Sequence, residues 1–226
     1  MGKKLLDLKK KIDRDQNYKL MDAVQLLKEN SFVSFNENLD IAIKLGVDPK
    51  NSAQNVRGSI ILPHSVEKKI RLAVICGEEL KEEVEKLGVN FCNAEAIIDS
   101  IKKKEINFDI CVCDSTMIGL VSSVAKILGP KGLMPNIRNG TLTSDVLSAI
   151  KNLKKGQIDY KIDKNSIIHS SVGKLSFSVD DLVENIKVFL DKIKNSKPQD
   201  FKGMFLKKIS LTSTMGIGLK IDLLSV

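Results

Sequence analysis

The hydrophobic pattern of the chain changes twice along its 226 residues. Residues 1–65 and 158–226 contain runs in which apolar and polar residues alternate, which is typical of strands with one buried face. Residues 66–157 instead contain short apolar runs separated by helical patterns, which indicates βαβ units and a mainly parallel sheet. The pattern therefore predicts an α+β outer domain, discontinuous and split β-α-β-like, with an inserted α/β Rossmann-like domain.

The first outer segment begins with a basic stretch that predicts a helix, and a second helix is expected at about residues 21–28. Apolar side chains occupy every other position of residues 39–47, so this run predicts a half-buried strand. Residues 48–58 are rich in turn formers and predict a loop. A further strand is expected at residues 59–62, and Pro63 ends it.

The middle segment alternates strands and helices. Its strands are expected at short apolar runs, namely residues 70–76, 89–91 and 108–113. Its helices are expected at residues 78–87, 94–103, 115–128 and about 144–154. A loop rich in Gly and Pro, residues 129–136, lies before the last helix. This order of elements predicts the inserted α/β domain.

The last segment returns to alternation. Strands are expected at residues 158–162, 167–172, 207–211 and 219–223, and at a short alternating run of Leu175, Phe177 and Val179. An amphipathic helix is expected between these strands, at residues 180–194, with Asp180 as its N-cap. The predicted domain boundaries are residues 1–65 plus 158–226 for the outer domain and residues 66–157 for the inserted one.

The chain is basic, and its composition favours a nucleic-acid partner. The net charge is +8, and only four of the 36 basic residues are Arg. Lys is a hydrated point charge that suits backbone phosphates better than bidentate reading of bases. Aromatic residues make up 4% and Trp is missing, which argues against a protein that stacks successive bases. We therefore expect recognition of a folded RNA by its shape and backbone.

No constellation of residues predicts catalysis. The sequence has neither a P-loop nor a strand followed by G-x-G-x-x-G, and its two histidines, His64 and His169, lack a nucleophile motif. The four cysteines form no C-x-x-C pair, so they predict reduced core thiols and no zinc site. We expect no enzyme activity, no cofactor and no metal. The alternative from this pattern is an enzyme that binds a nucleotide at the ends of the parallel strands.

The sequence predicts neither a membrane segment nor an export signal. It has no run of about 18 apolar residues, and its charged N-terminal stretch is unlike a signal or transit peptide. Free thiols fit a reducing compartment. The expected location is therefore the cytoplasm.

Several motifs occur in an order that carries a family resemblance. They are QNVRG at 54–58, LPH at 62–64, LGPKGLMPN at 128–136, DKNSIIH at 163–169, VGK at 172–174 and STMG at 213–216. Over essentially its whole length, the chain resembles the bacterial ribosomal protein L-one family, the protein of the mobile stalk of the large ribosomal subunit. The resemblance implies the same arrangement of an outer RNA-binding domain and an inserted α/β domain.

The resemblance also implies a function without catalysis. Members of the family bind large-subunit rRNA to form a stalk near the exit site, which assists release of deacylated tRNA. Bacterial members repress translation by binding their own operon mRNA. The implied partners are large-subunit rRNA, operon mRNA and exit-site tRNA, with no membrane, for a protein of the bacterial ribosome that is a monomer outside it. A related RNA chaperone or assembly factor with the same fold is the remaining alternative.

The family's RNA face, carried over residue by residue, predicts these RNA-binding residues: Phe35, Asp163, Lys164, His169, Lys174, Lys208, Ser213, Thr214, Met215 and Gly216. Lysines neutralise phosphates, the hydroxyls of Ser213 and Thr214 suit ribose and phosphate groups, and Phe35 and Met215 offer apolar contact. Gly216 lets RNA approach the main chain. Phosphate repels Asp163, so that residue is expected to accept from a ribose hydroxyl or to orient a lysine. The loop at residues 129–136 is not expected to be a primary rRNA contact.

Overall fold

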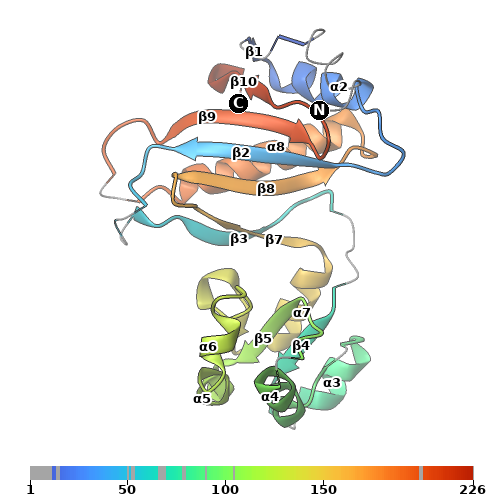
Figure 1. Cartoon of the computed structure of the whole chain (residues 1–226), viewed down its shortest axis with the longest axis vertical. Coiled ribbons are helices and arrows are strands. Elements are labelled where there is room, and N and C mark those ends of the chain that lie inside the picture. The colour runs from blue at the N-terminus through green and yellow to red at the C-terminus, as the bar shows by residue number, and fades with distance from the viewer. Residues whose placement is uncertain are drawn as a thin grey trace. The chain divides into compact units, whose positions relative to one another are not determined.

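The computed structural model describes residues 12–13, 16–49, 51, 54–65, 70–77, 80–89, 91–103, 105–198 and 201–225. The chain divides into two compact units, one formed by Met1–Val66 with Ile158–Val226 (the first unit) and one by Glu67–Gln157 (the second unit). Each unit has its own hydrophobic core, and Figure 1 shows its elements. The mixed α/β character that the pattern predicts is confirmed. The helix expected from the basic N-terminal stretch lies outside the described residues.

A five-stranded sheet organises the first unit, with the strand order β1-β10-β9-β2-β8. Its strands are β1 (Asn17–Tyr18), β2 (Asn38–Leu45), β8 (Ile167–Lys174), β9 (Leu206–Ser213) and β10 (Leu219–Ile221). β2 pairs in antiparallel fashion with both β8 and β9. β10 is antiparallel to β9, and β1 joins the edge parallel to β10. Strands from both ends of the chain therefore build one sheet.

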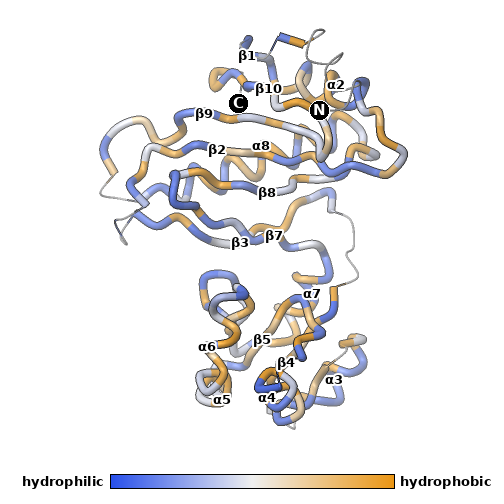
Figure 2. The backbone as a smooth tube through the Cα atoms, in the orientation of Figure 1, coloured by the Kyte–Doolittle hydropathy of each residue, from blue (hydrophilic) through white to orange (hydrophobic). Residues whose placement is uncertain are grey.

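One face of this sheet is covered by two helices, α2 (Leu20–Glu29) and α8 (Val179–Asn195). The alternating apolar side chains of β2 point to these helices, and all four are at most 1% exposed: Leu39, Ile41, Ile43 and Leu45. Figure 2 shows hydrophobic and hydrophilic residues interspersed along the strands, as one buried face requires. The strand predicted at residues 39–47 and the helix predicted at residues 21–28 are thus confirmed. The polar side chains of β2 lie on the other face of the sheet.

The start of α8 corrects two predictions. Ser178, not Asp180, is the N-cap: its hydroxyl accepts from the Asp181 N–H at 3.1 Å, and the Asp181 carboxylate accepts from the Ser178 N–H at 3.3 Å. This reciprocal pair is a capping box. The strand expected at Leu175, Phe177 and Val179 is wrong, because residues 175–178 form a turn and Val179 opens the helix. Their apolar side chains face the core from a turn and a helix start.

A second, two-stranded sheet in the first unit consists of β3 (Arg57–Ile61) and β7 (Gln157–Lys161). Tyr160 of β7 packs edge-on against Phe189 of α8, with ring centroids 5.9 Å apart. A Cβ atom on Gly58 would lie 2.8 Å from the Tyr160 hydroxyl oxygen. The glycine of the QNVRG motif is therefore explained by packing inside the first unit.

The second unit contains a parallel three-stranded sheet, in the order β4-β5-β6. Its strands are β4 (Leu72–Ile75), β5 (Ile110–Asp114) and β6 (Leu142–Thr143). Its helices are α3 (Lys81–Lys86), α4 (Ala94–Lys102), α5 (Ile118–Ser122), α6 (Ala125–Leu128) and α7 (Val146–Lys154). The parallel βα pattern expected for residues 66–157 is present, and apolar side chains of β4 and β5 are almost fully buried.

Two predictions for the second unit need correction. The strand expected at residues 89–91 is represented by one parallel bridge, between Phe91 and Ala73. The single helix expected at residues 115–128 is broken into a 3₁₀ turn (Ser115–Met117), α5 and α6. The hydroxyls of Ser122 and Ser123 donate to the carbonyls of Ile118 and Leu120, at 2.9 and 2.7 Å. Such side-chain bonds compete with helix continuation.

The cysteines serve as core residues, as predicted. All four are free, and Cys76, Cys111 and Cys113 are buried. Burial raises the pKa of Cys111 to about 12 and that of Cys113 to about 11, so both thiols stay protonated at neutral pH. Among the residues placed by the structure, no helix has the length and apolar character needed to cross a membrane.

Candidate RNA-binding site

The side of the five-stranded sheet that faces away from α2 and α8, which we call the open face, carries the polar residues of the alternating strands. On β2 its residues are Asn38, Asp40, Ala42 and Lys44; on β8, His169, Ser171 and Lys174; on β9, Lys208, Ser210 and Thr212. The register aligns them in rows across the three strands. His169 and Ser210 flank Ala42, and Ser171 and Thr212 flank Asp40.

The open face brings three of the predicted residues into this grid. Lys174 lies opposite Asn38 at one end of β2, His169 lies opposite Ala42 in the middle, and Lys208 lies opposite Lys44 at the far end. Burial raises the pKa of Asp40, while a hydrogen bond with Ser171 acts in the opposite sense. The face therefore combines lysines at both ends with hydroxyl groups, an imidazole and the Asp40 carboxylate between them. The lysines suit phosphates, and the hydroxyl, imidazole and carboxylate groups suit riboses.

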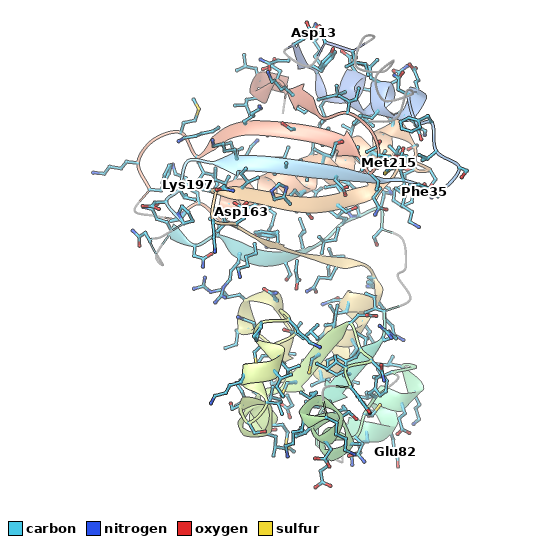
Figure 3. The ribbon with its side chains drawn as sticks, viewed as in Figure 1. Asp13, Phe35, Glu82, Asp163, Lys197 and Met215 are labelled. Atoms are coloured by element: carbon cyan, nitrogen blue, oxygen red, sulfur yellow. The ribbon has the colours of Figure 1, made fainter. Side chains whose placement is uncertain are left out.

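A second group of predicted residues gathers at the end of the open face where β2 begins and β9 ends. Phe35 is 53% exposed and Met215 is 52% exposed, which is unusual for large apolar side chains. Figure 3 places both labels at this end of the sheet and Asp163 at the opposite end. Thr214 is tied to the start of β2, because its N–H donates to the Asn38 carbonyl at 3.1 Å and its hydroxyl accepts from the Asn38 N–H at 3.0 Å.

Glu37 connects the segments at this end of the sheet, although nothing in the sequence singled it out. Its side chain is 2% exposed; one carboxylate oxygen accepts from the Met215 N–H at 2.8 Å and the other from the Ser31 hydroxyl at 2.7 Å. Its main-chain carbonyl accepts from the Leu175 N–H at 2.9 Å. One residue thus joins three segments that are far apart in the sequence. The one signal for Glu37 in the sequence is an acidic residue two positions after Phe35, in a chain that is expected to bind an anion.

Ser213 does not offer its hydroxyl at the surface, as the resemblance suggested. The residue is 3% exposed, and it continues the buried side of β9 after Ile209 and Leu211. A Cβ atom on Gly216 would lie 2.3 Å from the Ser213 hydroxyl oxygen, and the Gly216 N–H donates to the Ser213 carbonyl at 3.1 Å. Ser213 therefore supports the turn that presents Thr214 and Met215.

Asp163 and Lys164 lie at the opposite end of the sheet, in the turn between β7 and β8. The Asp163 carboxylate accepts from the N–H groups of Asn165 and Ile167, each at 2.8 Å. Its other oxygen lies 3.9 Å from the His169 imidazole. Lys164 is exposed beside it. Asp163 therefore organises the turn and faces His169.

The hydrogen bond from the Ile167 N–H, with that from Asn165 and the proximity of His169, holds the pKa of Asp163 below its usual range. Ionised Asp163 therefore stabilises the fold above its ordinary pKa of about 4, and this contribution is lost as the pH falls through the lower folded-state value. We expect Asp163→Ala to lose less stability than the wild type between about pH 5 and pH 2. Urea unfolding at several pH values in this range measures the free energy of unfolding of both proteins. Asp191→Ala, on the exposed side of α8, is the control; an Asp163 variant with the wild-type pH dependence contradicts the assignment.

Thr214→Val removes a hydroxyl at the center of the Phe35–Met215 end. We expect it to weaken RNA binding by about 1–3 kcal/mol, because two groups lose a hydrogen-bond partner. One is a polar group of the RNA in a desolvated contact, and the other is the Asn38 N–H. Thr116→Val, in the second unit, is the control, since it removes a hydroxyl that bonds to Asp114 at 2.8 Å. Equilibrium binding to an rRNA fragment measures the change, and full affinity in Thr214→Val would contradict this placement of the site.

The loop at residues 129–136 belongs to the second unit and is not part of the open face. Asn136 closes it: its N–H donates to the Thr141 hydroxyl at 2.8 Å, and its carbonyl accepts from the Thr141 N–H at 3.2 Å. Gly132 and Gly140 have positive φ angles, which favour glycine. Internal contacts therefore account for the shape of this loop.

His64 shows no catalytic arrangement. Its Nε2 atom lies 3.0 Å from a Glu184 carboxylate oxygen, and the main-chain N–H of His64 donates to the Asn185 side-chain oxygen at 3.0 Å. Asn185 is fully buried and also donates to the carbonyls of His64 and Val172. These contacts anchor the residues after β3 to α8. Within the described part of the chain, no group of three or more His, Cys, Asp or Glu side chains could hold a metal ion.

Comparison with known proteins assigns the family. Residues 27–217 match the model of the ribosomal protein L1p/L10e family. The chain is 46% identical over 225 residues to the large ribosomal subunit protein uL1 of Rickettsia akari, and the match covers 100% of this chain and 94% of that protein. It is 47% identical, with the same coverage, to the protein of that name from Rickettsia prowazekii. The matched family consists of ribosomal proteins and not of enzymes. The chain belongs to the ribosomal protein L1p/L10e family.

Proposed function

We propose that this chain is a structural component of the large ribosomal subunit and binds large-subunit rRNA with the open face of its first unit. The observation that carries the proposal is the convergence of exposed Phe35 and Met215 with Thr214 at one end of a face that also bears Lys174 and His169. Large exposed apolar side chains beside cations are suited to sugars, bases and phosphates of a folded RNA.

The Glu37 carboxylate makes this end suitable for specific recognition. The loop that presents Thr214, Met215 and Gly216 is held in place by a buried side chain before RNA arrives. A preformed loop loses little conformational freedom on binding, so more of the contact energy is available for affinity. Shape and 2′-hydroxyl contacts of this kind persist at high salt, unlike phosphate attraction alone.

In the complete proposal, the protein and its rRNA form the mobile stalk near the exit site, in the cytoplasm of a bacterium, and assist release of deacylated tRNA. The protein is a monomer outside the ribosome. The same face binds a similar fold in the mRNA of its own operon and represses translation. One face with two RNA partners predicts competition, so excess rRNA fragment should displace the operon mRNA.

Cosedimentation tests the ribosomal assignment against that of an assembly factor. Tagged protein is expected to migrate with mature large subunits in a sucrose gradient and to remain bound after a high-salt wash. Migration with immature particles only would support an assembly factor and contradict a structural component. The membership of the family and the match over the full chain favour the first outcome.

A further inference from the structure

Where β1, β10 and β9 lie side by side in the five-stranded sheet, the first unit contains a hollow of about 390 Å³. Of the predicted RNA-binding residues, only Lys208 lines it. Three lysines line it: Lys207, Lys208 and Lys220. Asn17, at the start of β1, and Asp222, after β10, complete its polar lining. We propose that this lysine hollow binds the sugar–phosphate backbone of the same RNA, and so extends the contact surface from the open face across β10. The inference rests on the proposed function.

A break in the strand register creates the cluster. Lys44 pairs with Lys208, but the next residue of β2, Leu45, pairs with Leu206, so Lys207 is an extra residue on β9. Such a bulge redirects side chains. Without it, the alternation that buries Ile209 and Leu211 would turn Lys207 towards the core, yet both Lys207 and Lys208 are exposed. The bulge therefore adds a lysine to the surface at this point.

The pairing of β10 adds the third lysine. Lys220 lies opposite Ser210, an open-face residue, and its neighbours Leu219 and Ile221 are buried. Lys220 therefore projects on the same side of the sheet as Lys208. On the other flank of Lys220, β1 contributes Asn17 in register, whose side-chain amide can donate to an anion. The hollow is thus continuous with the open face.

The charge of this region favours an anion. Lys44 and Lys208 face each other directly, and like charges at opposed positions destabilise a sheet. Asp222 lowers the local positive charge, but one of its carboxylate oxygens also accepts from the Leu224 N–H at 3.0 Å. A phosphate group would offset the repulsion between the lysines, and ammonium groups suit phosphates as point charges. Because the hollow is continuous with the open face, an RNA backbone is the source of these phosphates.

The test compares two double variants of the full chain that remove the same charge. Lys207→Ala/Lys220→Ala removes two of the three lysines that line the hollow. Lys187→Ala/Lys192→Ala, the control, removes two exposed lysines from α8, which covers the other side of the sheet. Binding to the stalk rRNA fragment is measured between about 50 and 300 mM salt. Thermal unfolding verifies that both variants are folded.

We expect Lys207→Ala/Lys220→Ala to weaken binding at low salt about 5- to 30-fold and to make the slope of log affinity against log salt shallower by about 1–2. The control should stay within about twofold of the wild type with an unchanged slope. Equal slopes in the two variants would overturn the inference. If the wild type does not prefer the stalk fragment over an unrelated hairpin, the proposed function itself is wrong.

Titration with inorganic phosphate separates an RNA site from a small-anion site. We expect free phosphate to bind weakly. We also expect the affinity for RNA to keep its dependence on Lys207 and Lys220. Saturable phosphate binding that requires both lysines, with an unchanged RNA salt slope in the variant, would identify a small-anion site and overturn the RNA assignment.

Discussion

Glu37→Ala is expected to lower the free energy of unfolding by about 2–4 kcal/mol, because it removes a charged acceptor that takes two part-buried hydrogen bonds. The donors are the Met215 N–H and the Ser31 hydroxyl. Affinity for the rRNA fragment is expected to fall about 10- to 100-fold, since about 1.4 kcal/mol corresponds to a factor of ten. Removing a negative charge would by itself strengthen phosphate binding. A loss of affinity would therefore report the lost position of the loop. Urea unfolding and equilibrium RNA binding measure the two effects.

Two further variants make the Glu37 prediction specific. Glu37→Gln retains the size of the side chain and an oxygen that can accept from the Met215 N–H, and the Ser31 hydroxyl can accept from the new amide. We expect it to retain most of the affinity. Glu29→Ala, on the exposed side of α2, removes the same charge and should not weaken RNA binding. Wild-type affinity in folded Glu37→Ala would contradict the positioning role.

Gly216→Ala is expected to weaken RNA binding about 10- to 30-fold and to cost about 1–3 kcal/mol of stability, the range for overpacking a filled site. The added Cβ would lie 2.3 Å from the Ser213 hydroxyl oxygen, so either the side chain or the turn must shift. Ser213 is 3% exposed and has little room to move away. Gly216 does not have a positive φ angle, so the backbone itself would accept alanine. The effect therefore comes from one contact beneath the Thr214–Met215 turn.

The chain offers both a control and a rescue for Gly216. Gly218→Ala places its Cβ in open space, with no atom within 4 Å, and should bind RNA like the wild type. Ser213→Ala combined with Gly216→Ala removes the clashing oxygen and should restore much of the affinity. Equal affinity of Gly216→Ala and Gly218→Ala would contradict this account. An affinity for RNA in the double variant that is no higher than in Gly216→Ala would also contradict it.

Local patterns predicted most elements of the first unit, because a half-buried strand or helix carries its own signal. The alternation of residues 39–47 identified β2, and the apolar stripe of residues 180–194 identified α8. The helix start was missed because Ser178 and Asp181 satisfy each other's N–H groups, a local device that the apolar stripe does not reveal. The apolar alternation at residues 175–179 came from a turn whose side chains also face the core.

Three features of the candidate site were not predicted, and each has a physical cause. The resemblance placed Ser213 at the surface, whereas the period of two through Ile209 and Leu211 would have placed it inside. Glu37 could not be found from its neighbours. Its carboxylate accepts from the N–H of Met215, which is 178 positions away in the sequence. The bulge that exposes Lys207 likewise depends on pairing between distant strands.

The measurement that tests the central claim most directly is binding of the pure protein to the stalk rRNA fragment and to an unrelated hairpin of equal length, at low and at high salt. We predict much tighter binding to the stalk fragment, with the preference retained at high salt, because preformed contacts at Phe35, Thr214 and Met215 depend little on counterion release. Equal binding to both RNAs, lost with salt, would contradict the account and would reduce the open face to a surface with nonspecific phosphate attraction.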